Sequence, residues 1–497
     1  MTGLTNPMTA GKVWMNVTSS MGWSRSAVGI IRVEVELARA LEAHFGQRFA
    51  RCIWRAHGGF ESLQLGVQGS EQASRDHLAA VAARTAFHRK VTSYLRPVGR
   101  KQALVLMAQA MLSLLPTSLR APMTRLMIWM SPALTHAVSW MVSQKRTWGP
   151  RFRGLSKRLG IRPSLQPFGP AGPWHGGAEM GCLQPGDVLI SVGLDWDTEV
   201  YKAFYSLREQ GVRVVACCYD TIPVLFPQYC LAQVAQTFTG YFATLADSVD
   251  HVICISQQTQ KDFHSVVNRI GGHDAVPSSV FRLGDQVGRS LDQPSMSQVL
   301  ARLDLTGRPF ILYVSTIERR KNHEVLYWAY HRLASQGLSD KLPLMVFVGM
   351  KGWGVDQLMT DLALDPLTDG LVRVLHQIDD HQLCALYQAS LFCVFPSLYE
   401  GWGLPVSEAL GFGKAVICSN QGSLPEVGQD LVHYLDPWDV GAWAAEIYKM
   451  STETGYRQAL EDRIRRQYRP YSWQESAASV IKVIEALEPK QERLEKH

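Results

Sequence analysis

The chain has 497 residues, of which 46% are hydrophobic and 19% charged, and its formal net charge at pH 7 is +6. This is the composition of an ordinary globular protein, and the length suffices for two large α/β domains with additional elements. No apolar run reaches the roughly 18 residues of a membrane-spanning helix, and residues 1–14 lack a signal-peptide pattern, so we expect neither a secreted nor a spanning protein. Nine cysteines without paired spacing favour reduced thiols in the cytoplasm.

Short apolar or β-branched runs alternate with amphipathic segments in the first half of the chain, which is typical of parallel α/β folds. The predicted strands are 13–18, 48–54, 187–193, 213–219, 251–256 and 279–284, and helices are predicted at 28–42 and 197–209. The polar stretch 285–308 has no strand signal, and we expect the linker between two domains there. The first domain is therefore predicted to span 1–290.

One segment of this first domain differs sharply in charge. Between Asp76 and Glu179 there is no acidic residue, whereas 15 lysines and arginines occur there, so the rest of the chain is net acidic. Two apolar stretches, 103–115 and 126–142, lie within it. We expect 77–178 to be a basic, helical insertion that faces an anionic membrane surface, where each basic residue contributes about 1 kcal/mol. A helical insertion packed on the first sheet, a spanning hairpin and a nucleic-acid-binding segment are the alternatives.

The strand and helix pattern begins again after the linker. Strands are predicted at 309–315, 342–349, 372–378, 391–397, 415–420 and 433–436, with helices near 322–336, 380–389, 405–412 and 439–450. The second domain is predicted to span 300–470, followed by a helical segment, 471–497. The fold class is thus α/β, with two Rossmann-like, doubly wound parallel sheets. Because open parallel sheets bind ligands at the carboxyl ends of their strands, we expect the site between the two sheets.

Two glutamates stand eight positions apart in the stretch SLYEGWGLPVSEALGFG. Glu400 follows a predicted strand, and the glycines after it allow the backbone to approach a ligand closely. Pro405 suits the first turn of a helix and Gly413 its end, so Glu408 is predicted on that helix. A loop carboxylate and a helical carboxylate are suitable acceptors for the hydroxyls of a polyol, although ordinary surface positions are an equally good reading of these residues alone.

The wider segment FPSLYEGWGLPVSEAL, together with GSLPEVGQD at 422–430, resembles the donor-binding signature of the retaining family 4 glycosyltransferases, which have the GT-B fold. The resemblance implies that Glu400 contacts the donor sugar and that Glu408 accepts the ribose hydroxyls of the nucleotide. It further implies a set of sugar-binding residues around the glycines. These are Gly401, Trp402, Gly403 and Leu404.

A second block, YVSTIERRKNHEVL, resembles the segment in which the same family binds the donor diphosphate, and places Arg320 and Lys321 at that task. Fixed cations stabilise the negative charge that develops on a departing diphosphate. The block VFVGMKGWG implies that Gly349 lies near the nucleotide, although a strand-to-loop glycine needs no such role. An RRK turn can also be merely a solvated basic turn.

The resemblance in the first half is carried by two shorter segments. SAVGIIRVEVELARAL resembles the start of the first helix in these enzymes, with Gly29 near the phosphates and acceptor. YDTIPVLFPQY resembles an acceptor-side segment in which Asp220 is the candidate catalytic contact, whereas Tyr219 stands where many relatives have histidine. The segment 470–487 resembles the last helix of the family, which crosses back to the first domain, with Trp473 as a packing residue.

The resemblance implies a retaining, metal-independent hexosyltransferase of bacterial polysaccharide or O-antigen synthesis, with a mannosyl group as the leading choice. Its expected partners are a nucleotide-sugar donor, a lipid-linked glycan acceptor and an anionic membrane surface, without nucleic acid, at the inner face of the cytoplasmic membrane. No metal or other cofactor is expected, since no spacing typical of metal ligands is present. A glycoside hydrolase or phosphorylase, and a non-catalytic membrane-associated scaffold, remain the alternative functions.

Overall fold

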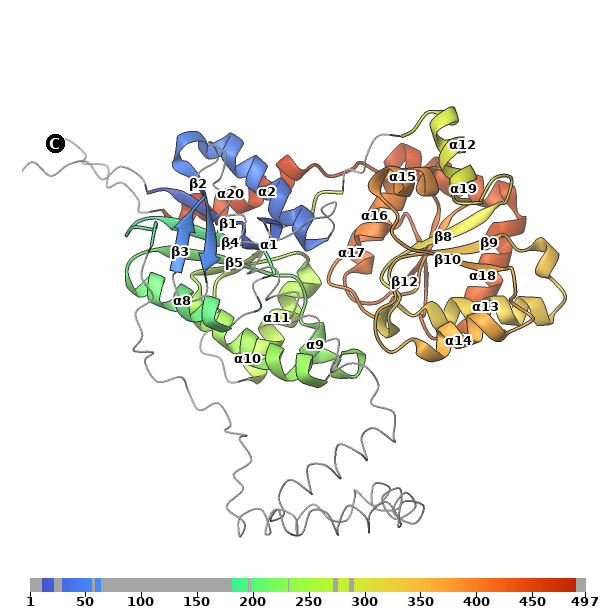
Figure 1. The fold of residues 1–497 in the computed structure, drawn as a ribbon, viewed down its shortest axis with the longest axis horizontal. Helices are drawn as coiled ribbons and strands as arrows, with labels where there is room; N and C mark the ends of the chain where they lie inside the picture. Colours follow the sequence, from blue (N-terminus) through green and yellow to red (C-terminus); the bar gives the residue numbers. More distant parts are fainter. Residues whose placement is uncertain are drawn as a thin grey trace, which may run out of the picture. The chain divides into compact units, whose positions relative to one another are not determined.

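The computed structural model describes residues 11–21, 29–55, 59–63, 181–194, 196, 198–230, 232–270, 276–285 and 290–488. The described residues belong to one compact unit that contains two separate β-sheets (Figure 1). The basic segment 77–178 and its predicted apolar stretches lie outside the described residues.

The first sheet has seven described strands in the order β3-β2-β1-β4-β5-β6-β7. They are β1 (Val13–Asn16), β2 (Phe49–Arg55), β3 (Gly59–Ser62), β4 (Val188–Ser191), β5 (Arg213–Cys218), β6 (His251–Cys254) and β7 (Ser278–Val280). All neighbouring strands pair in parallel except β2 and β3. Every residue of β1 and β4 is buried, which is usual for central parallel strands covered on both faces.

Helices cover both faces of this sheet. One face packs against α2 (Ile30–Phe45) and the other against α8 (Thr198–Glu209), α10 (Ala232–Ser248) and α11 (Gln257–Arg269), and each face has its own cluster of buried apolar residues. Ser256 caps α11 through a hydrogen bond from the amide of Thr259. The antiparallel strand β3 was not predicted, because four residues without clear alternation give little strand signal.

The second sheet has six strands, all parallel, in the order β10-β9-β8-β11-β12-β13. They are β8 (Phe310–Val314), β9 (Leu344–Val348), β10 (Val372–Leu375), β11 (Cys393–Phe395), β12 (Val416–Ser419) and β13 (His433–Leu435). Figure 1 shows α13 (His323–Ser335) and α14 (Asp356–Leu364) on one side of the sheet, with α15 (Asp380–Ala389) and α16 (Leu404–Gly411) on the other. Helices α17 (Leu424–Gly428), α18 (Val440–Thr452) and α19 (Thr454–Gln467) complete this half.

The segment predicted as a linker, 285–308, contains a helix. Asp292 accepts a hydrogen bond from the amide of Ser295 and so caps α12 (Gln293–Arg302), which contacts α15 beside the second sheet. The predicted start of the second domain at residue 300 therefore divides a helix. A polar, proline-containing stretch of this kind is easily taken for a loop, because only Val299 of α12 is buried.

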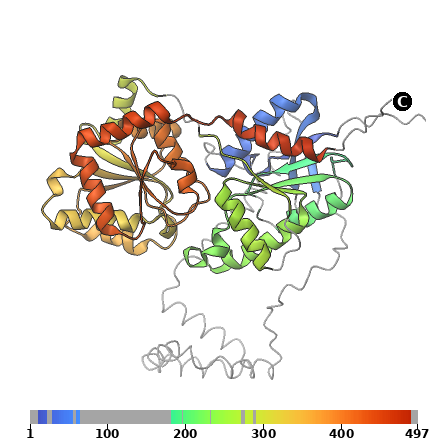
Figure 2. The same cartoon turned by 180° about the vertical axis from the view of Figure 1, so that it is seen from behind.

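The chain returns to the first sheet through α20 (Trp473–Leu487), which packs against α2 (Figures 1 and 2). Trp473 is buried, and its ring lies so close to Gly284 that a Cβ there would approach it within 2.5 Å. Trp473 is thus a packing residue, as its sequence context indicated.

The two segments that join the sheets are hydrogen-bonded to each other at Asp285. Its amide donates to the carbonyl of Tyr471 (2.9 Å), and its carboxylate accepts from the amide of Tyr471 (2.5 Å) and the hydroxyl of Tyr468 (2.7 Å). Arg282 adds an ion pair at 2.9 Å to the same carboxylate, which is completely buried.

Candidate active site

The loop that carries Glu400 is defined by the elements on either side of it. Strand β11 ends at Phe395, and α16 begins at Leu404 with Pro405 in its first turn. Gly403 precedes the helix with φ = 134°, and Gly413 follows it with φ = 68°, two conformations that favour glycine. The predicted helix start and stop are therefore confirmed, and Glu400 lies on the loop.

Glu400 is buried between two cations. Its side chain is paired with Arg320 Nη1 at 2.8 Å and with Lys321 Nζ at 2.5 Å. Both cations belong to the short turn Arg319–Lys321, which directly follows β8. Residues predicted for separate tasks thus lie together, because β8 and β11 are neighbouring strands that end at the same edge of the sheet.

Arg320 is held by three groups. Besides Glu400, its guanidinium donates to the carbonyl of Tyr399 (2.8 Å) and to the carboxylate of Glu318 (2.9 Å). Glu318 is itself buried. A planar guanidinium with partners on several sides has little freedom to rotate, so this cation is fixed in position before any ligand binds.

The charges shift each other's pKa. Burial raises the pKa of Glu400, but Arg320 and Lys321 outweigh this effect and lower it to about 2. Burial lowers the pKa of Lys321, and Glu400 partly restores it. Glu400 is therefore an anion at all physiological pH values, and it balances the cations beside it.

Asp220 lies close to this cluster. It follows β5, it is half-buried, and its carboxylate accepts a hydrogen bond from the amide of Ile222 (3.0 Å). Burial raises its pKa, against the effect of Arg320. The contact with the Glu400 loop is direct, since a Cβ on Gly401 would lie 2.2 Å from the carbonyl oxygen of Tyr219. Gly401 thus permits this approach of the two backbones.

Tyr219 stands at the position where a histidine was expected from the resemblance. Its hydroxyl donates to the carbonyl of Val192 at 2.6 Å, at the end of β4. The carbonyl of Tyr219 lies near Thr259 Oγ1, at 3.4 Å. The phenol is therefore anchored to the first sheet.

Glu408 has a different environment from Glu400. One oxygen accepts from the hydroxyl of Tyr387 (2.8 Å), and the other lies 3.4 Å from the guanidinium of Arg32, which also approaches Asp380 at 3.6 Å. Burial raises the pKa of Glu408, whereas Arg32 and Tyr387 oppose the rise. Arg32 belongs to α2, so Glu408 is contacted from both halves of the molecule.

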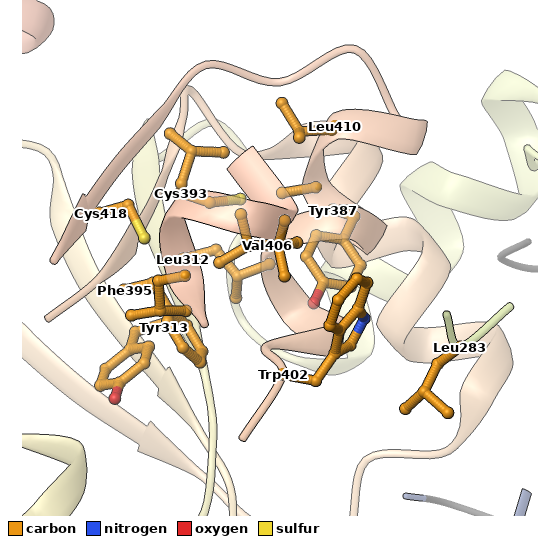
Figure 3. Close-up of a cluster of buried hydrophobic side chains, with 14 of the residues drawn as sticks. Leu283, Leu312, Tyr313, Tyr387, Cys393, Phe395, Trp402, Val406, Leu410 and Cys418 are labelled. Carbon is orange, nitrogen blue, oxygen red and sulfur yellow. The ribbon is translucent and has the colours of Figure 1, made fainter. Parts of the chain in front are cut away.

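Trp402 packs into the interior of the second half. Its ring lies near Tyr387, Val406 and Leu283 (Figure 3), and it is 6% exposed. The guanidinium of Arg282 lies 5.9 Å from the ring centre. Trp402 is a packing side chain in this structure, and any contact with a sugar from this position would come from the backbone, as it would from Gly403 and the half-buried Leu404.

The two remaining glycines have contrasting surroundings. A Cβ on Gly349 would lie 1.9 Å from the carbonyl oxygen of Ser315, so close packing between β8 and β9 explains the glycine. Gly29 precedes α2 with φ = 52°, and among the described residues a Cβ there would meet nothing within 4 Å. Gly29 is therefore explained by its backbone conformation.

Within the described part of the chain, no group of three or more histidine, cysteine, aspartate or glutamate residues is arranged to hold a metal ion. None of the described helices is long and apolar enough to cross a membrane.

Sequence reasoning missed three residues of the site. Arg32 lies within the quoted segment GIIRVEVE, but only its glycine was singled out. Tyr387 had no signal beyond its place on an amphipathic helix, and Glu318 resembled a surface charge beside two arginines. Arg32 and Tyr387 contact Glu408, from which they are distant in the sequence or separated by a loop. Glu318 pairs with Arg320 within one turn.

Comparison with known proteins gives one family match. The sequence pattern described as "Glycosyl transferases group 1" matches residues 301–467, which include Arg320, Lys321, Glu400 and Glu408.

Two curated relatives are from Escherichia coli. The O-antigen chain mannosyltransferase B is 34% identical over 189 residues, which cover 38% of this chain and 49% of the relative. The serotype-specific mannosyltransferase WbdA is 25% identical over 335 residues, which cover 63% of this chain and 40% of the relative. The chain thus spans about half or less of the length of these relatives.

Among solved structures, a sucrose-phosphate synthase from Thermosynechococcus elongatus matches with a TM-score of 0.55. The match covers 96% of this chain and 99% of that chain at 16% sequence identity, so it concerns the fold alone. It extends over both sheets described above.

Proposed function

We propose that this protein transfers a hexose from a nucleotide diphosphate sugar to a glycan hydroxyl, because residues 301–467 match the group 1 glycosyl transferases and the two sheets have the GT-B fold. We take the hexose to be mannose, since two of the relatives are mannosyltransferases. The acceptor proposed is a lipid-linked or growing polysaccharide. The anomeric configuration is proposed to be retained.

The observation that carries this proposal is the cluster of Arg320, Lys321 and Glu400. A diphosphate gains negative charge as the bond to the sugar breaks, and fixed cations stabilise that charge without reorganising. The ammonium of Lys321 has three N–H donors, and among the described residues it donates to Glu400, so donors remain for phosphate oxygens. The cluster therefore supports a diphosphate site that needs no metal ion.

The two glutamates have separate roles in the proposed reaction. Glu408 accepts the ribose hydroxyls, and Glu400 positions the donor sugar beside the cations. The acceptor hydroxyl attacks the anomeric carbon on the face of the leaving group, the bond to the diphosphate breaks, and the departing phosphate oxygen takes the hydroxyl proton. Glu400 forms no covalent bond in this scheme, and its low pKa suits a permanent anion that stabilises positive charge on the sugar.

The first experiment is calorimetric binding of GDP, UDP and dTDP, without added metal and again with EDTA. Wild type should bind one nucleotide selectively, and Arg320→Ala/Lys321→Ala should lose that binding. Arg320→Lys keeps the charge but loses the planar fork, so it should bind more weakly than wild type and better than the double variant. Lys341→Ala, at an exposed position remote from the site in sequence, is the control.

Absence of binding by all three nucleotides at millimolar concentration would contradict the proposal. If one nucleotide binds, transfer from the matching mannose donor is then followed by NMR, in which the one-bond C1–H1 coupling constant reports the anomeric configuration of the product. A product with inverted configuration would reject the retaining scheme but would not contradict the proposed donor site.

We further propose that the protein acts at the cytoplasmic membrane surface, on the basis of the basic segment 77–178 alone. A lipid-linked acceptor cannot leave the bilayer, so an enzyme that extends it must approach the surface. Sedimentation with vesicles containing anionic lipid tests this at physiological salt. Equal recovery with anionic and neutral vesicles would reject it.

A further inference from the structure

Aromatic residues from three separate loops contact one another, and one of them, Tyr399, immediately precedes Glu400 in the chain. Phe226 and Tyr229 belong to the segment that follows β5, Trp353 to the loop that follows β9, and Tyr399 to the loop that follows β11. The rings of Phe226 and Tyr399 are 4.5 Å apart, and those of Phe226 and Tyr229 are stacked at 5.9 Å. We call these four residues the aromatic cluster.

The cluster is only partly buried. Trp353 is 43% exposed, its neighbour Met350 is 57% exposed, and the other three aromatic residues are half-buried. A core cluster of this size would be sequestered from water, and a flexible surface tryptophan would have no fixed partner. Trp353 instead donates its indole N–H to the carbonyl of Tyr229 at 2.9 Å, so that an exposed ring is held in one orientation. Little side-chain freedom remains to be lost when a ligand stacks on it.

Polar groups lie at the edge of the cluster. The hydroxyl of Tyr399 donates to Asp262 at 2.6 Å and accepts from Gln258 at 3.2 Å. The side chain of Gln258 also donates to Asp262 at 2.8 Å. Carboxylate, amide and phenol groups beside aromatic faces offer both the apolar surface and the hydrogen bonds that a sugar ring requires. An apolar peptide would make no use of the remaining hydrogen-bonding capacity of these polar groups.

Two residues of the cluster lie close in the sequence to the residues proposed to take part in the reaction. Tyr399 immediately precedes Glu400, and its carbonyl accepts a hydrogen bond from Arg320. Phe226 lies on the segment that begins with Asp220. A sugar ring seated on the cluster would therefore lie next to the side chains to which we assign the donor sugar.

We propose that the aromatic cluster is the subsite for a sugar ring of the acceptor glycan. The proposal rests on the proposed transferase function and adds the recognition of the acceptor to it. The ring stacks its C–H face on Trp353 or Phe226, and its hydroxyls bond to Gln258 and Asp262. The cluster thereby selects a carbohydrate acceptor and presents its hydroxyl toward Glu400.

The test compares binding of acceptor and donor in the same variants. The probes are α-mannotriose, followed by saturation-transfer NMR, and whichever of GDP, UDP and dTDP wild type binds, followed by calorimetry. Trp353→Ala should weaken α-mannotriose binding about tenfold, because it removes the exposed stacking face, and should leave nucleotide binding within twofold. Trp353→Phe, which keeps a stacking face, should retain most of the binding.

Two controls distinguish loss of the stacking contact with the sugar from loss of protein stability. Trp438→Ala removes another exposed tryptophan, 66% exposed, and should change neither probe. Phe226→Ala loses the ring contact with Tyr399, so its thermal midpoint is measured alongside; Phe226→Tyr restores a ring of similar size and should restore binding.

The outcomes discriminate clearly. Equal loss of α-mannotriose and nucleotide binding in Trp353→Ala would show that the cluster only packs the two halves together, and would overturn the proposal. Unchanged α-mannotriose binding in Trp353→Ala would overturn it as well. So would a wild type that binds a nucleotide but none of α-mannotriose, galactotriose and chitotriose. Failure of wild type to bind any of GDP, UDP and dTDP would instead reject the transferase function on which the proposal rests.

Discussion

Glu400 and Glu408 are eight residues apart in one short motif, yet their surroundings act in opposite directions. Glu400 lies on a loop between two cations, which lower its pKa to about 2 despite burial. Glu408 lies on α16 beside a phenol and one more distant guanidinium, and burial raises its pKa. Both side chains are almost completely buried. Burial alone therefore does not set the charge of a site carboxylate, because the number and distance of its cationic partners do.

The contrast suits the two proposed roles. A residue that must remain an anion while positive charge develops on a sugar gains from two close cations. A residue that accepts ribose hydroxyls needs lone pairs that remain available, and one hydroxyl partner with one long ion pair leaves some of them so. Three substitutions test this difference, and their expected effects decrease in the order given.

Glu400→Gln should have the largest effect. It leaves Arg320 and Lys321 buried with only the carboxylates of Glu318, paired with Arg320, and of nearby Asp220, and breaking a buried ion pair in this way costs about 3–5 kcal/mol of stability. Loss of one preorganised electrostatic group should lower turnover by about 10²–10³-fold. Turnover with mannose donor and urea denaturation measure the two effects. Glu485→Gln, in an exposed pair on α20, is the control.

Turnover close to that of wild type in Glu400→Gln would remove the assigned role. A stable but inactive variant would keep the catalytic role and show that the cations find other partners.

Glu408→Gln should weaken binding of the mannose donor by about tenfold or more at pH 8, since a hydrogen bond to a charged group contributes about 1.5–3 kcal/mol. In wild type, the raised pKa means that Glu408 takes up a proton at a higher pH than an ordinary glutamate as the pH falls. Donor affinity should therefore decline in wild type as the pH falls, starting above the range in which an ordinary glutamate titrates, and remain flat in the variant. Calorimetry uses the mannose donor of whichever nucleotide binds, because the sugar caps its diphosphate and avoids titration of a terminal phosphate. Parallel pH profiles would contradict this assignment.

Arg32→Met should have the smallest effect. It removes a cation that opposes the rise in the pKa of Glu408, so the decline in donor affinity should begin at a higher pH. The pair is long, at 3.4 Å, and the guanidinium is partly exposed, so we expect this shift to be small. Arg39→Met, on the same helix with an exposed side chain, should leave the profile unchanged. A profile of Arg32→Met that matches wild type would show that Arg32 does not act on Glu408.

Much of this architecture could be predicted from the sequence, since it depends on local patterns. The strands and helices of the second sheet follow from apolar runs and periodicity, and Pro405 and Gly413 mark the ends of α16. The turn with Arg320 and Lys321 was predicted to lie at a strand end, which brings it to the edge where Glu400 lies. These signals span fewer than about twenty residues each.

The contacts that the sequence could not predict join residues far apart in the chain. Arg32 and Glu408 are separated by 376 positions, and the pairing of α2 with α16 depends on how the two halves meet. The reason for a glycine at a given position is also not visible in the sequence when it depends on a distant segment. Gly349 and Gly401 each lie within reach of a carbonyl oxygen from another segment, and only the folded structure identifies that segment. Strand β3 was missed because its pairing with β2, and not its own sequence, makes it a strand.

The position of α20 has a consequence for how the protein is made. Its apolar side chains complete the buried cluster that α2 forms on the first sheet, although α20 follows the whole second half in the sequence. During synthesis, the second sheet has all its strands before α20 leaves the ribosome. The first half therefore waits longest for its last packing partner, and its uncovered apolar face is the surface most exposed to aggregation or to chaperones in the nascent chain.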